Sequence, residues 1–383
     1  MVATGVYCNT PSPDWKAYRA KFNARFWSEA QAKDSGETLY IDTRWVVLHS
    51  SEEQKIPIER IQNCHKMLNL IFRGENTAEL EKVPNTSRNP WKPRIGVPNI
   101  QFLPLDSSTL NVEYRQTSSN LSGSSPVSDA AKRGDRVDGV LNLYVGSSGH
   151  GTILGQAELN SNIAYGLYSA IGGYDVPGTL PGYHMGKTMA HEVGHALGLV
   201  HTFSDSQCDG FSPYTDVPES IRPNFTQELF EVSPGVWDQK DDNRYKDREN
   251  GTKLSCLHVE PDPETATNDM AINIMDYGDD TASVMFSQNQ ALMMRTYLQS
   301  SDNTTLQLKN ADATSISSGG SGSGVGSAAV AEASSSSSSL STTAIVIIAV
   351  LGGLFVIFML IFVYKYSHGK RTVKAASSYL TYV

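Results

Sequence analysis

The sequence has 383 residues and lacks several features that mark common classes of protein: it shows no internal repeat, no long basic run and no CxxC pair. Because none of its four cysteines forms a CxxC pair, a zinc site built from cysteine is not expected. The net charge of −9, without a basic run, argues against nucleic acid as the main partner. The first residues also lack the apolar core of a signal peptide.

The C-terminal part of the chain has the composition of a tether followed by a membrane span. Residues 313–343 are almost entirely Ser, Gly, Ala and Thr, which is typical of a flexible linker. Residues 344–364 are apolar and uncharged, and as a helix they would be about 31 Å long, close to the hydrocarbon thickness of a bilayer. The tail at 365–383 carries basic residues and no acid. This pattern predicts one transmembrane helix with a cytoplasmic tail and an extracellular domain.

The lack of a visible signal peptide leaves two topologies open. Either a leader is missing and the chain is a single-pass protein of the cell membrane, or it is tail-anchored with its domain in the cytosol. The charge asymmetry around the span and the presence of cysteines favour the first. Sequons for N-glycosylation are compatible with it, and they stand at Asn85, Asn120, Asn224, Asn250 and Asn303.

The region before the linker alternates between strand and helix patterns. Strands are predicted at 38–50, 97–105 and 137–146, where β-branched, aromatic and other apolar residues gather. Helices are predicted at 56–74 and 183–199, where apolar residues recur near helical spacing or small residues predominate. Because strands and helices interleave, the sequence predicts an α/β domain.

The segment 189–203, MAHEVGHALGLVHTF, holds three of the nine histidines. His191 and His195 are four residues apart, so on a helix both rings share one face and can bind the same ion. Gly198 allows the left-handed conformation that ends a helix, and the chain can then return His201 as a third ligand. Three neutral ligands leave a fourth position for water, which is typical of a catalytic zinc site.

Glu192 lies between the first two histidines in the sequence and projects to the side of the metal-binding face. It can hydrogen-bond a metal-bound water without binding the metal, which is the position of a general base. The pattern therefore predicts zinc-dependent hydrolysis. The alternatives are a surface helix that carries histidines and a folded zinc site without activity.

The sequence HEVGHALGLVH resembles the zinc signature of the metzincin metalloproteases. Within them, GKTMAHEVGHALGLVHTF and NIMDYGDD resemble the pappalysin family, which includes ulilysin-like and secreted fungal proteases. The resemblance covers about residues 38–300 and implies the same three zinc ligands and the same general base. It further implies that Met275 lies in a tight turn beneath the metal. Tyr277 would approach the metal or the oxyanion, or else have a packing role.

A fold and a function follow from this resemblance. It implies a metzincin-like α/β domain: an upper part at 36–201 with a twisted mixed sheet, a backing helix and the active-site helix, and an irregular lower part at 202–312 with the Met-turn and a C-terminal helix. Residues 1–35 would remain from a pro-segment. The predicted function is a membrane-anchored zinc metalloendopeptidase that hydrolyses extracellular proteins or peptides. The alternatives are a catalytically silent cell-surface binding or adhesion protein and a zinc hydrolase of non-peptide bonds.

The cysteines and acids near the signature carry further expectations. The resemblance implies a Cys208–Cys256 disulfide, whereas Ala282 stands where the family usually has another cysteine. Cys8 could pair with Cys64, or it could cap the zinc as in related proenzymes and hold the enzyme latent. Relatives can bind calcium near the metal site, although a solvated acidic loop is the alternative. The acids available for calcium are Asp205, Asp209, Asp216, Asp276, Asp279 and Asp280.

Overall fold

The structure is a computed structural model of the chain. The residues that it describes are Cys8, 24–85, 89–104, 110–118, 120, 126–134, 136–147, 153–203, 214–218, 220 and 270–309. All of them belong to one compact unit, which spans Met1–Ser318. The predicted disulfide between Cys208 and Cys256 and the predicted membrane span at 344–364 lie outside the described residues. Within the described ranges, no helix is long and apolar enough to cross a bilayer.

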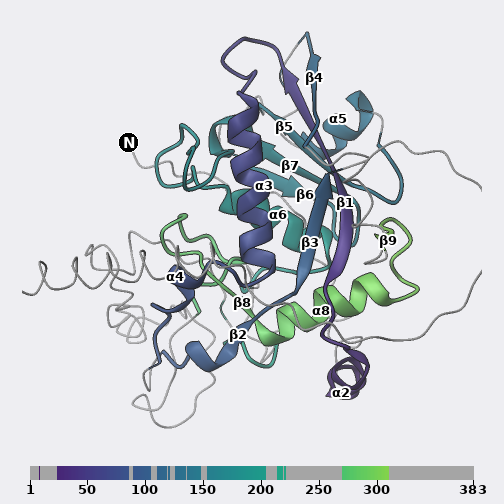
Figure 1. Cartoon of the computed structure of the whole chain (residues 1–383), viewed down its shortest axis with the longest axis vertical. Helices are drawn as coiled ribbons and strands as arrows, with labels where there is room; N and C mark the ends of the chain where they lie inside the picture. Colours follow the sequence, from purple (N-terminus) through teal and green to yellow (C-terminus); the bar gives the residue numbers. More distant parts are fainter. Residues whose placement is uncertain are drawn as a thin grey trace, which may run out of the picture. The chain divides into compact units, whose positions relative to one another are not determined.

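A sheet runs through the centre of this unit (Figure 1), and its longest described strand is β1, Leu39–His49. Along one side, β1 pairs in parallel with β3 (Ile100–Pro104) and β4 (Val112–Gln116). Along the other side it pairs in parallel with β5 (Leu141–Gly146). Most side chains of β1 are buried, as is typical of a parallel strand that is covered on both faces.

The sheet ends at a short antiparallel strand. β5 pairs in parallel with β7 (Ile163–Leu167), and β7 pairs antiparallel with β6 (Gly155–Ala157). Cys8 forms an isolated parallel bridge with Gly155, so the N-terminal segment lies along the edge of β6 at this residue. The C-terminal strand β9 (Leu308–Lys309) pairs antiparallel with the beginning of β1.

Helices cover both faces of the sheet (Figure 1). α3 (Ile58–Phe72) and α6 (Lys187–Ala196) pack on the face that carries Trp45, where the main core lies. α5 (Pro126–Arg133) packs on the opposite face, which carries Val46. Neighbouring residues of β1 thus point to opposite cores, as the period of a strand requires.

The last described helix is α8, Gln288–Gln299, which matches the predicted C-terminal helix. It begins with a capping box: Gln290 N donates to Ser287 Oγ at 3.2 Å, and Ser287 N donates to Gln290 Oε1 at 2.8 Å. The other described elements are α2 (Ala24–Lys33), α4 (Thr77–Leu80), the 3-10 helices Lys92–Arg94 and Tyr168–Ala170, and the paired strands β2 (Ile95–Gly96) and β8 (Phe286–Ser287).

The predicted α/β class with a mixed sheet is confirmed, and β1 and α3 occupy the segments predicted for them. Three other elements begin later than their sequence patterns indicate. Each begins after a residue with a left-handed backbone, with φ of 51° at Asn99, 78° at Gly139 and 82° at Gly186. Because this conformation fits neither a strand nor a right-handed helix, β3, β5 and α6 can start only after these residues.

Candidate metal centre

Three histidine rings converge at the C-terminal half of α6. His191 and His195 lie one turn apart on the helix, and His201 follows the turn that ends it. The Nε2 atom of His195 is 3.1 Å from Nε2 of His191 and 3.1 Å from Nε2 of His201. Two nitrogens that bind a tetrahedral ion at their usual bond lengths lie about 3.3–3.4 Å apart. The spacing of the rings therefore matches a shared ion.

A glycine turn returns the third histidine to the site. Gly198 has φ of 96°. Gly198 N donates to His195 O at 2.9 Å, and Leu199 N donates to Gly194 O at 2.9 Å. These two bonds form a Schellman motif, which satisfies carbonyls at the helix end and reverses the chain. The turn carries the chain from α6 back to His201.

Hydrogen bonds to backbone carbonyls set the tautomers of two rings. His191 Nδ1 lies 2.7 Å from Ile274 O, and His195 Nδ1 lies 2.8 Å from Leu199 O. A carbonyl only accepts, so each Nδ1 carries the proton and each Nε2 keeps its lone pair. Orienting bonds of this kind are typical of histidines that bind metals.

Burial keeps these histidines neutral. It lowers the pKa of His191 to about 4, and it lowers the pKa of His195 and His201 well below the ordinary value. The Nε2 lone pairs of His191 and His195 then face each other across 3.1 Å, an arrangement that a cation stabilises. The donor set therefore fits a zinc ion.

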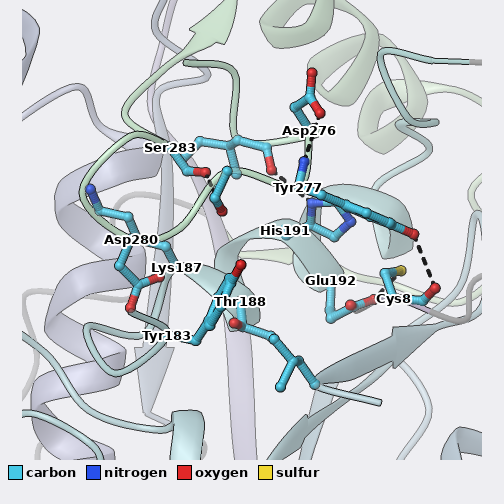
Figure 2. Close-up of a pocket in the computed structure, with 13 residues that line it drawn as sticks. Cys8, Tyr183, Lys187, Thr188, His191, Glu192, Asp276, Tyr277, Asp280 and Ser283 are labelled. Carbon is cyan, nitrogen blue, oxygen red and sulfur yellow. Dashed lines mark hydrogen bonds between the residues drawn. The ribbon is translucent and has the colours of Figure 1, made fainter. Parts of the chain in front are cut away.

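Glu192 and Cys8 lie next to each other beside His191 (Figure 2). Cys8 Sγ donates to Glu192 Oε2 at 3.5 Å and lies 3.5 Å from His195 Nε2. The ligand atoms of Cys8 and the three histidines all lie within 4.8 Å of one another. Cys64 is a free thiol buried in α3, so the expected alternative of a Cys8–Cys64 disulfide is wrong. Cys8 instead lies where a fourth ligand would bind.

Met275 packs directly beneath α6. A Cβ atom on Gly194 would lie only 2.6 Å from Met275 Sδ, so the close approach requires glycine at this position. Tyr277 follows on the same turn, with its ring 5.1 Å from that of His201. Its hydroxyl donates to Cys8 O at 3.0 Å. The structure thus brings both predicted residues to the histidine cluster.

A pocket opens beside His191 and Glu192 (Figure 2). Its far wall includes Asp280, whose carboxylate accepts from Met185 N; burial raises the pKa of this carboxyl to about 6. Lys187 also lines the pocket, and its Nζ pairs with Glu79 Oε1 at 2.6 Å. Sequence reasoning treated Lys187 only as part of an apolar helix, although a lysine at the start of such a helix is a signal that could have been followed.

None of the acids proposed for calcium that the structure describes belongs to a group of three or more ligand atoms close enough to share an ion. Asp216 Oδ2 accepts from Asn289 N at 2.9 Å and so caps α8. Asp276 Oδ2 accepts from Thr202 Oγ1 at 3.1 Å. Asp205 and Asp209 lie outside the described residues. Calcium binding stays a prediction.

The fold and the site together define a class: an α/β domain whose helix presents two histidines and whose glycine turn returns a third. No protein-family model matches the chain. In sequence, the chain is 32% identical over 120 residues to an extracellular metalloprotease of Colletotrichum graminicola and 36% identical over 100 residues to one of Pyricularia oryzae. These matches cover 31% and 25% of this chain and 34% of each relative. The chain thus spans about a third of the length of these curated relatives.

Among solved structures, the fold is similar to that of mirolysin from Tannerella forsythia. Mature mirolysin in complex with a cleaved peptide gives a TM-score of 0.54 at 22% identity, over 70% of this chain and 94% of that chain. A promirolysin mutant gives a TM-score of 0.56 at 20% identity, over 78% of this chain and 96% of that chain. The predicted resemblance to secreted fungal metalloproteases is confirmed by the sequence matches, and the solved structures share the fold.

Proposed function

We propose that this protein is a zinc-dependent metalloendopeptidase that hydrolyses extracellular proteins or peptides. The observation that carries the proposal is the convergence of three neutral Nε2 atoms, with 3.1 Å between His195 and each of the other two, beside the carboxylate of Glu192. Relatives that share sequence with this chain are named extracellular metalloproteases, which supports the same reaction here.

The zinc ion would be held by His191, His195 and His201. Glu192 would transfer the proton of the attacking water. When bound, zinc supplies polarisation of the scissile carbonyl and a water of lowered pKa. The buried carboxylate of Glu192 takes the proton of the attacking water and then delivers it to the leaving amine. The Tyr277 hydroxyl, which donates to Cys8 O, is placed to donate to a substrate carbonyl instead.

We further propose that the described arrangement is latent. Cys8 fills the position beside His195 and Glu192, and it also pairs with the edge strand at Gly155. A substrate in extended conformation would use the same edge of β6. Water and substrate therefore gain access only when the segment that carries Cys8 leaves the site. Residues 1–35 would then act as a pro-segment.

We propose the location of the reaction from the composition of the rest of the chain. The proposed transmembrane helix at 344–364 would anchor the catalytic domain at the cell surface, and the linker at 313–343 would let it reach nearby substrates. The same anchor would serve a tail-anchored protein, for which the catalytic domain would face the cytosol. The Cys208–Cys256 disulfide and the glycans belong to the extracellular alternative.

The test is casein cleavage by the purified full chain in detergent, carried out in a Cys8→Ala background that removes the capping thiol. We expect cleavage that a chelator abolishes and that Glu192→Ala reduces by about 10³-fold, a typical loss for a general base. Glu52→Ala removes an exposed acid and should leave the rate unchanged. Zinc binding without turnover would indicate the silent binding protein, and turnover of non-peptide substrates alone would indicate another hydrolase.

A further inference from the structure

The carboxylate of Glu192 lies against the backbone of β6 at Gly155. A Cβ atom on Gly155 would be 2.4 Å from Glu192 Oε1, 2.5 Å from its Cγ and 2.7 Å from its Cδ. Real Cβ atoms essentially never come closer than 3.0 Å to such neighbours. Because Cγ, Cδ and Oε1 are bonded in sequence, rotation of the carboxylate alone does not relieve the contact. Any side chain at this position would force the whole glutamate to move.

The two elements that meet at this contact are each held in place. On α6, the residues on either side of Glu192 are tied by the bonds of His191 to Ile274 O and of His195 to Leu199 O. On β6, Gly155 pairs with Gly166 of β7. The next residue, Gln156, accepts from Val127 N at 2.9 Å through its Oε1, which fastens the strand to α5. Neither element can retreat without breaking these bonds.

The backbone of Gly155 gives no other reason for a glycine. Six of the described glycines have a left-handed φ, and Gly155 is not among them. Its conformation is therefore open to any residue. Glycine is required at this position because it has no side chain.

The carboxylate of Glu192 lies between the strand and Cys8. Oε1 of Glu192 is the atom nearest to the Cβ position of Gly155, whereas Oε2 accepts from Cys8 Sγ, which itself lies 3.5 Å from His195 Nε2. Figure 2 shows Glu192 and Cys8 side by side. One oxygen thus rests against the strand while the other points to the position of the fourth ligand.

We propose that Gly155 is a positioning residue for Glu192. Its lack of a side chain lets the edge strand hold the carboxylate with one oxygen toward the histidine cluster. The proposal rests on the proposed role of Glu192 as general base, but the contact itself can be tested without any activity. The edge of β6 then has two tasks, because the strand that would bind an extended substrate also orients the base.

The first test compares Gly155→Ala with Gly166→Ala in the Cys8→Ala full chain. Gly166 is the strand partner of Gly155, but its Cβ would meet the flexible end of Met189, 2.8 Å away, and of Ile171, 2.9 Å away. We expect Gly155→Ala to lower kcat about 100-fold, the typical cost of a misplaced catalytic group, with KM and zinc content nearly unchanged. Gly166→Ala should keep kcat within about threefold. Equal losses in the two variants would overturn the proposal.

The second test is a double-mutant cycle on thermal unfolding of the metal-free full chain, which does not depend on activity. Gly155→Ala should lower Tm when Glu192 is present, and it should lower Tm by less than half as much when Glu192→Ala has removed Cγ, Cδ and the carboxylate. If Gly155→Ala fails to fold, folding of the double variant would support the proposal. Equal decreases in both backgrounds, or failure of both to fold, would contradict it. If the chain shows no peptidase activity but Gly155 and Glu192 are coupled in this cycle, the proposed function is refuted while the proposed contact is supported.

Discussion

At the scale of single residues, the thiol of Cys8 occupies the side of the site where water would have to bind. Cys8 Sγ lies 3.5 Å from both His195 Nε2 and Glu192 Oε2. The backbone carbonyl of Cys8 accepts from the Tyr277 hydroxyl. One short segment thus engages a proposed metal ligand, the proposed base and the proposed oxyanion donor. Latency through this residue is therefore a property that a single substitution can test.

We predict that Cys8→Ala raises the peptidase activity of the freshly purified full chain at least tenfold, because removal of the thiol frees the fourth position for water. Initial rates of peptide cleavage measure the effect. Cys64→Ala is the matched control, since this buried thiol of α3 takes no part in the site and its removal should not activate the chain. Equal rates for Cys8→Ala and the unchanged chain, with zinc bound to both, would argue against latency through Cys8.

A buried histidine outside the site predicts a pH dependence of stability. His65 Nδ1 accepts from Trp45 Nε1 at 3.2 Å, and His65 Nε2 donates to Phe102 O at 3.1 Å. Burial lowers its pKa from 6.5 to about 4. A base with a lowered pKa favours folding while it is neutral, so its contribution is present above pH 6.5 and is lost as the pH falls toward 4.

The loss amounts to about 3 kcal/mol of unfolding free energy, from 1.36 kcal/mol for each pKa unit. Urea denaturation of metal-free protein at several pH values between 4 and 7.5 measures it. The comparison with His65→Gln isolates this residue, because the zinc-site histidines are the same in both chains. Identical pH slopes for the two proteins would show that His65 does not carry the effect.

At the scale of elements, the sequence predicts the central strand, the backing helix and the zinc helix because their periodicity and composition are local signals. It does not predict where β3, β5 and α6 begin, since that depends on the left-handed backbones of Asn99, Gly139 and Gly186. The three-residue strand β6 is too short to leave a pattern. Its pairing with Cys8 is a contact between distant parts of the chain, which no local signal reveals.

The candidate site also has parts that local sequence signals predict and parts that depend on the packing of distant segments. The spacing of His191, His195 and His201 is a local signal, so their convergence follows from one helix and one turn. The approach of Met275 to Gly194 depends on how two distant segments pack. Only the resemblance implied that Met275 lies beneath the metal. On the far wall of the pocket, Lys187 was missed although it lies on the predicted zinc helix. Asp280 was named only as a calcium candidate, because its approach to the pocket depends on packing between distant segments.

The turn after α6 gives a prediction at this scale. Gly198→Ala places a Cβ at φ of 96° and within 2.6 Å of Asn160 Oδ1. We expect a loss of about 1–3 kcal/mol in stability from the strained backbone, and weaker zinc binding because His201 follows the turn. Thermal unfolding and a competition assay with a zinc chelator measure the two effects.

Gly36→Ala is the control for this substitution, since Gly36 also has a left-handed backbone, with φ of 71°, but no atom within 4 Å of its Cβ position. It should destabilise through backbone strain alone and leave zinc affinity unchanged. If both variants keep the zinc affinity of the parent, the turn does not position the third ligand.

At the scale of the whole molecule, the proposed arrangement is a catalytic domain, a linker and an anchor. The full chain should partition into the detergent phase of a cloud-point separation, whereas the chain shortened to residues 1–318 should stay in the aqueous phase, because only the former carries the apolar run at 344–364. A second variant with two lysines in place of Leu354 and Phe355 should partition like the shortened chain. Recovery of the full chain in the aqueous phase would contradict the membrane anchor.

Zinc-edge X-ray absorption of the full chain shows whether His191, His195 and His201 hold one zinc ion. We predict one zinc per chain with three nitrogen ligands at about 2.0–2.1 Å and one sulfur ligand at about 2.3 Å. The sulfur should be replaced by an oxygen ligand in Cys8→Ala. A chain that binds no zinc, or a zinc shell with fewer than three nitrogens, would refute the proposed zinc site.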